Sequence, residues 1–110
     1  MSRSVQERFA DILAAIERCL DYRPYLDDAD SHIASMAYDA VLRNLAVIGE
    51  AVRALPSSET DARPEVPWAS IAGLRNVVVH EYFRVNHDLI RDIVDDQLVS
   101  LARALRTPPG

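Results

Sequence analysis

Apolar residues recur at steps of three and four along most of this chain, which is the spacing of one face of an α-helix. The first series begins after Ser4 and Glu7, whose spacing is that of a capping box, and it ends near Arg23 and Pro24. Its apolar members are Val5, Phe9, Ile12, Leu13, Ile16 and Leu20. The pattern predicts a first helix with one face against a core.

A second and longer helix is predicted over 32–55, capped by Asp30 or Ser31 after an acidic turn at 25–30. Its apolar seam consists of Ala37, Val41, Leu45, Ile48, Val52 and Leu55, widened by Met36, Leu42 and Val47. A stripe this wide must touch more than one neighbour. Gly49 costs about 1 kcal/mol relative to Ala, so we expect a close helix crossing or a functional approach there. Glu50 is either a buried partner for an arginine or a solvated charge.

The next two helices are separated from the second by a connection at 56–67 that is rich in Pro, Ser and charge. It has no apolar period and is long enough to let the third helix swing freely around the bundle. That helix is predicted to begin at Pro67 and Trp68 and to run on through 75–83, because Pro is favoured at a helix start. A fourth helix is expected after Asn86, with Leu89, Ile90, Ile93, Val94, Leu98, Leu101 and Leu105 on its apolar face.

The segment 75–83, RNVVVHEYF, carries the candidate chemistry. On a helical wheel its core face is formed by Ile71, Leu74, Val77 and Val78. Arg75, Asn76 and His80 lie on the other side, and Tyr82 shares a stripe with Arg75. Val79 lies among these polar groups, where a solvated helix should have a polar residue, so we expect this face to be covered. A short buried strand at 77–79 is the competing interpretation, since valine favours strands.

Composition limits the class of protein. With 110 residues, the chain is expected to form a single domain over 1–110, with a frayed tail at 107–110. It has no apolar run long enough to span a membrane and no signal-peptide core, so we expect a cytoplasmic protein. The net charge of −5 argues against non-specific nucleic-acid binding. All twelve basic residues are arginine, and Arg75, Arg84 and Arg91 are expected to form a local cluster for an anion.

Other reactive side chains carry weaker signals. Cys19 beside the first apolar stripe is expected to be a small core residue, and a single cysteine excludes an internal disulfide. His32 and His87 lie near predicted helix starts, which favours solvated surface positions. No cysteine, histidine or glycine-rich motif of a metal or phosphate site occurs in the sequence. We therefore expect no metal and no nucleotide cofactor.

Two blocks of this sequence carry a resemblance to a known family. The segment 43–56, RNLAVIGEAVRALP, and the segment 67–83, PWASIAGLRNVVVHEYF, resemble those of the HepT-like branch of the HEPN superfamily. Within the second block, Arg75, His80 and Tyr82 fit the family's motif of arginine, four to six residues, histidine, any residue and tyrosine. The similarity covers nearly the whole chain.

The resemblance implies a fold, an activity and a partner. The fold would be an all-α, antiparallel four- to five-helix up-and-down bundle that forms a homodimer. The activity would be that of a metal-independent endoribonuclease toxin of a toxin–antitoxin pair. The partner would be a small nucleotidyltransferase antitoxin that transfers AMP units to Tyr82 and that could form a higher heteromeric complex with the homodimer.

Cleavage of RNA by its own 2′-hydroxyl needs a base, an acid and positive charge near the phosphate. One chain offers only one well-placed histidine, so two copies facing each other across a two-fold axis would complete the site. In this interpretation His80 is the general acid or base, Arg75 binds the phosphate, and Asn76 orients His80 or the RNA. Two rivals stay open: a non-catalytic interaction or nucleotide-binding module that partners a nucleotidyltransferase, and a purely structural bundle.

Overall fold

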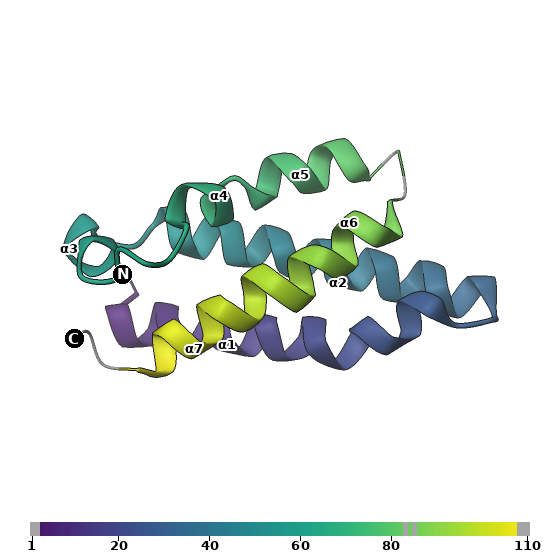
Figure 1. Cartoon of the computed structure of the whole chain (residues 1–110), viewed down its shortest axis with the longest axis horizontal. Coiled ribbons are helices and arrows are strands. Elements are labelled where there is room, and N and C mark those ends of the chain that lie inside the picture. Colours follow the sequence, from purple (N-terminus) through teal and green to yellow (C-terminus); the bar gives the residue numbers. More distant parts are fainter. Residues whose placement is uncertain (1–2, 83, 85, 108–110) are drawn as a thin grey trace.

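The chain folds into a bundle of helical rods that lie along one another (Figure 1). This computed structural model describes residues 3–82, 84 and 86–107. Its elements are α1 (Val5–Tyr22), the 3₁₀ helix η1 (Arg23–Asp27), α2 (Ser31–Arg53), α3 (Ser57–Asp61), α4 (Trp68–Ala72), α5 (Leu74–Glu81), α6 (His87–Asp92), the π-helix η2 (Ile93–Leu98) and α7 (Val99–Arg106). The predicted all-α bundle is confirmed, and the strand interpretation of 77–79 is wrong because these valines lie in α5.

The helices α1, α2 and α6 begin where the sequence places their caps. The Ser4 hydroxyl accepts a hydrogen bond from the Glu7 amide, and the Glu7 carboxylate accepts one from the Ser4 amide, which completes the capping box. Asp30 accepts from the amide of His32 at the start of α2. Asn86 accepts from the amide of Leu89 at the start of α6. Each cap satisfies an amide that the first helical turn leaves unpaired.

The core lies around α2, which packs against α1 on one side and against α4 and α5 on another. Its largest fully buried side chains are Ile12, Ile16, Leu26, Val41, Leu45, Ile48, Ile71, Leu74, Ile90, Val94, Leu98 and Leu101. Cys19 is also buried, and burial raises the pKa of its thiol to about 12. The expectation of a core cysteine is therefore confirmed. In the described part of the chain, none of the helices is both long and apolar enough to cross a membrane.

Gly49 marks the close helix crossing that the sequence predicts. A Cβ atom at this position would lie 3.2 Å from the Arg75 amide nitrogen and 3.4 Å from the carbonyl oxygens of Ile71 and Ala72. The backbone of α2 thus meets the junction of α4 and α5 directly. The absence of a side chain at Gly49 sets how closely the segment carrying Arg75 approaches α2.

The third helix is not one piece, contrary to the prediction. It is interrupted at Gly73, whose ψ of −3° separates α4 from α5. The Gly73 carbonyl accepts hydrogen bonds from the amides of both Asn76 and Val77, at 3.0 and 3.3 Å, so the chain turns more tightly there. Pro67 immediately precedes the first residue of α4. The break was not predicted because a glycine within an apolar period gives no sign of the tertiary contact beside it.

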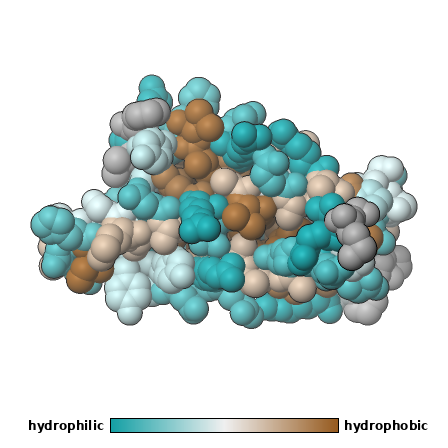
Figure 2. Space-filling model, turned by 180° about the vertical axis from the view of Figure 1, so that it is seen from behind, coloured by the Kyte–Doolittle hydropathy of each residue, from teal (hydrophilic) through white to brown (hydrophobic). Residues whose placement is uncertain are grey.

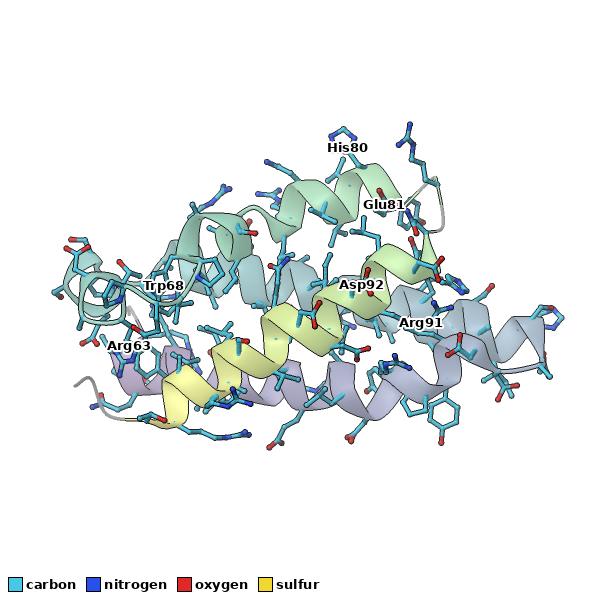
Figure 3. The ribbon with its side chains drawn as sticks, viewed as in Figure 1. Arg63, Trp68, His80, Glu81, Arg91 and Asp92 are labelled. Carbon is cyan, nitrogen blue, oxygen red and sulfur yellow. The ribbon has the colours of Figure 1, made fainter. Side chains whose placement is uncertain are left out.

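The connection between α2 and α4 is fastened to the bundle, so the prediction of a freely swinging third helix is wrong. It contains the short helix α3, and Arg63 and Val66 within it are buried. The Arg63 guanidinium pairs with Glu59 at 3.2 Å and lies 5.0 Å above the ring of Phe9. The Trp68 indole donates to the Arg63 carbonyl at 2.9 Å, and Figure 3 shows the two residues side by side.

The last rod combines α6, η2 and α7 in one continuous path (Figure 1), and its π-helical stretch was not predicted. Within that stretch, Asp95 accepts two hydrogen bonds from Arg23, at 2.6 and 2.8 Å. The acidic turn expected at 25–30 is partly the 3₁₀ helix η1, whose Leu26 is buried. Of the apolar residues predicted for this rod, Leu89 is partly exposed, whereas the rest are buried.

Candidate functional site

The two faces predicted for the third helix are present in α5. Leu74 is buried, and Val77 and Val78 pack against the core. His80 lies in the last turn of α5 and projects away from the bundle (Figure 3), and Asn76 is also exposed. The polar groups are therefore held on a firmly packed helix and are open to solvent in the single chain.

Arg75 is positioned by an ion pair. Its Nη1 atom lies 2.9 Å from Oε1 of Glu50 on α2, so Glu50 is the arginine partner that the sequence suggested. Of the two alternatives for Glu50, the solvated charge is confirmed and the buried position is excluded, because the Arg75 and Glu50 side chains are 57% and 52% exposed. Such an exposed pair contributes only about 0–1 kcal/mol to stability. A phosphate oxygen can therefore replace the Glu50 carboxylate at small cost.

Tyr82 follows α5 directly and is 61% exposed. Its amide donates to the carbonyl of Val78 at 2.9 Å, which continues the helical path for one more residue beyond Glu81. The side chain of Tyr82 is therefore not part of the hydrophobic core. Tyr82 and His80 are thus two residues apart in the sequence, and both are exposed near the C-terminal end of α5.

A buried tyrosine fixes this end of α5, and sequence reasoning missed it. The Tyr38 hydroxyl donates to the Glu81 carbonyl at 2.9 Å and accepts from the Asn86 amide at 3.1 Å. Its ring centroid lies 5.0 Å from that of His87. Burial raises the pKa of Tyr38, so the phenol stays protonated and can donate. Tyr38 thereby ties the end of α5, next to His80, to the start of α6.

This contact also corrects the interpretation of His87. The sequence favoured a solvated surface position, but His87 is half-buried against Tyr38. His32 is exposed at 95% of its side chain, as expected. Tyr38 itself could have predicted this connection between α5 and α6, since a buried tyrosine needs a partner for its hydroxyl.

The predicted cluster of three arginines does not form. Arg91 pairs with Asp27 at 2.7 Å and with Asp88, so two carboxylates already hold its guanidinium. Arg84 is exposed and lines a pocket of about 660 Å³ at the turn from α5 to α6. Arg75 is therefore the arginine that shares α5 with His80.

Comparison with known proteins shows the family of this chain. The family model described as ribonuclease HepT-like matches residues 12–107. The chain is 30% identical over 101 residues to putative RNase MJ1380 of Methanocaldococcus jannaschii, with 92% of this chain and 93% of that protein covered. It is 31% identical over 101 residues to probable ribonuclease HepT of Thermococcus cleftensis, with 92% of each chain covered. No solved structure shows significant similarity. The chain belongs to the HepT-like ribonuclease family.

Proposed function

We propose that this protein is a cytoplasmic endoribonuclease toxin that cleaves RNA without a metal ion, using His80 and Arg75. The observation that carries the proposal is the exposed pair of these two side chains on α5, in a chain of a ribonuclease family. His80 exchanges a proton with the 2′-hydroxyl or the leaving 5′-oxygen, and Arg75 stabilises the charge that develops on the phosphorus centre. Asn76, one turn before His80, orients the imidazole or the RNA.

The catalytic step conserves atoms and charge within the RNA. A base removes the proton of the 2′-hydroxyl, whose oxygen attacks the adjacent phosphorus atom. The bond to the 5′-oxygen breaks, and an acid protonates that oxygen, which leaves a cyclic phosphate and a free hydroxyl. One histidine cannot be base and acid in the same step, so His80 of a second copy supplies the other proton transfer.

The second copy fits the apolar surface beside the histidine. Val79 is 61% exposed in the single chain, next to His80. Figure 2 shows one apolar patch at the upper edge of the face behind that of Figure 1, on the side where α5 runs, with hydrophilic residues around it. A two-fold contact at this edge would cover Val79 and bring both copies of His80 and Arg75 into one groove.

Val79→Asp should shift the protein from dimer to monomer, because the contact would bury an unpaired carboxylate. Sedimentation at micromolar concentration should then give a mass near 12.3 kDa for the variant and about twice that for the wild type. Val79→Thr is the matched control, since it keeps the shape of the side chain without the charge. A wild-type protein that sediments only as a monomer would contradict the composite site.

The proposed control of the site is AMP transfer to Tyr82 by a nucleotidyltransferase antitoxin. Exposure of the Tyr82 ring supports this, since the hydroxyl of a buried tyrosine would be out of reach of another enzyme. An added nucleotide would place negative phosphate close to His80 and Arg75. It would compete with the RNA phosphate for the arginine and block the groove sterically.

Purified protein should cleave RNA in the presence of EDTA as fast as in its absence. The reason is that the proposed acid, base and positive charge all come from side chains, so chelation removes nothing that the reaction uses. Cleavage is measured on a labelled single-stranded RNA, with the His80→Ala protein as the control for contaminating nucleases. Activity that EDTA abolishes and a divalent ion restores would disprove the mechanism.

A further inference from the structure

A second polar site lies on the seam between α1 and α2, away from the turn that follows α5. It is a pocket of about 440 Å³ lined by Arg18, Tyr22, Ala40, Arg43, Asn44 and Val47. Each helix contributes residues four positions apart, which stack on one face of that helix. The two antiparallel helices thereby bring together Arg18 and Arg43, which are 25 residues apart in the sequence.

The lining of this pocket carries positive charge that no carboxylate among the described residues neutralises. The acidic residues outnumber the basic ones by 17 to 12, and carboxylates pair with Arg3, Arg23, Arg63, Arg75, Arg91 and Arg106. Within the part of the chain that the structure describes, neither Arg18 nor Arg43 forms an ion pair, and the pocket lining contains no carboxylate. Two guanidinium groups that share a pocket repel each other, so an anion between them relieves that repulsion.

The remaining walls suit a phosphate joined to a base. Asn44 is only 8% exposed, and its amide nitrogen donates to the Ala40 carbonyl at 2.8 Å. Because an amide group has two N–H bonds, the second one stays available to a ligand. Tyr22 is half-buried and offers an aromatic ring, on which a nucleobase can stack. Guanidinium groups bind phosphate oxygens bidentately.

The pocket lies within reach of the proposed cleavage site. Arg43 and Glu50 are seven residues apart on α2, so they lie on nearly the same side of the helix, about 10 Å apart along its axis. Glu50 is the residue that holds Arg75 at 2.9 Å. At the ~3.4 Å rise of a stacked strand, this separation corresponds to about three nucleotides.

We propose that Arg18 and Arg43, with Asn44 and Tyr22, bind a phosphate of single-stranded RNA about three nucleotides from the cleaved bond. This inference rests on the proposed ribonuclease function and adds the path of the substrate across α2. The pocket fixes the RNA by its backbone and stacks one base, so it adds affinity with little choice of sequence.

The test is RNA binding by the catalytically inactive His80→Ala protein, measured by fluorescence anisotropy with a labelled 12-nucleotide single-stranded RNA. Adding Arg18→Ala and Arg43→Ala should weaken binding about tenfold. It should also reduce the slope of log affinity against log salt by about 0.7 for each arginine. Replacing both by lysine should keep the salt slope but recover only part of the affinity, since lysine binds phosphate as a point charge.

The matched control is Arg103→Ala, which removes an exposed and unpaired arginine from α7, outside the pocket. It should change binding less than twofold. Because binding is measured without cleavage, failure of the wild type to cut RNA would count against the proposed function alone.

Several results would overturn the inference. RNA affinity that is unaffected by the double substitution, or lowered equally by Arg103→Ala, would exclude the pocket. A loss of dimer mass in sedimentation would show that the arginines instead meet a second copy of the chain. Inorganic phosphate or AMP that binds wild-type protein as tightly as the RNA does, and loses this affinity in the double variant, would identify a mononucleotide site instead.

Discussion

His80→Ala should lower the rate of RNA cleavage about 10²–10⁴-fold while leaving the fold intact. The rate falls because a positioned general acid or base contributes about that factor to proton transfer. The fold survives because His80 projects into solvent and is absent from the core. Single-turnover cleavage of a labelled RNA measures the rate, and thermal unfolding followed by circular dichroism checks the fold.

Arg75→Ala provides the second arm of this experiment. Removing one group that stabilises developing charge costs about 10²–10³ in rate, so its effect should be comparable. Glu50→Gln is the matched control, because it removes the ion pair at 2.9 Å and leaves the guanidinium in place. It should keep most of the activity and change stability by less than about 1 kcal/mol. Cleavage that persists at the wild-type rate in His80→Ala would assign the chemistry to another group.

The elements of the fold were predictable where the deciding contacts are local. Ser4 and Glu7 are three residues apart, and Asn86 caps an amide three residues ahead, so each cap is encoded within one helical turn. The two faces of α5 follow in the same way, because the period of Leu74, Val77 and Val78 decides which side packs.

The features that sequence reasoning missed depend on residues far apart in the chain. Tyr38 and Glu81 are separated by 43 residues, and Arg63 packs on Phe9 across an even longer stretch. Each contact is made by the polar end of a long side chain, the Tyr38 hydroxyl or the Arg63 guanidinium. The spacing of apolar residues gives no information about where such polar ends lie. The break at Gly73 depends likewise on α2, whose Gly49 lies against the junction.

Only part of the candidate site was predictable, because some of its features depend on local spacing and others on contacts distant in the sequence. The placement of His80 and Arg75 on the exposed face follows from helical spacing. Glu50 was identified as a possible arginine partner because it adjoins the glycine of the crossing, but the sequence left burial and exposure open as alternatives. A residue beside a crossing lies at the rim of the helix contact, whereas Gly49 itself lies inside it. The catalytic roles rest on the family and on chemistry, and mutants must test them.

The control of the site should depend on a single hydroxyl. Tyr82→Phe should cleave RNA at nearly the wild-type rate, because a phenol with a pKa of about 10 is a poor acid or base at neutral pH. The same variant should resist enzymatic neutralisation, since phenylalanine has no oxygen to attack the α-phosphate of ATP. In the wild type that oxygen forms a bond to phosphorus, pyrophosphate leaves, and the phenolic proton is lost to solvent.

The measurement is intact mass and RNA cleavage after incubation with the nucleotidyltransferase and ATP. Wild-type protein should gain mass in steps of one AMP unit and lose activity, whereas Tyr82→Phe should gain none and stay active. Tyr25→Phe is the matched control, because Tyr25 is also exposed, at 52%, but lies in η1, outside the motif. If the wild-type mass stays unchanged while the partner still inhibits cleavage, inhibition is by binding alone. Equal modification of the wild type and Tyr82→Phe would place the acceptor elsewhere on the chain.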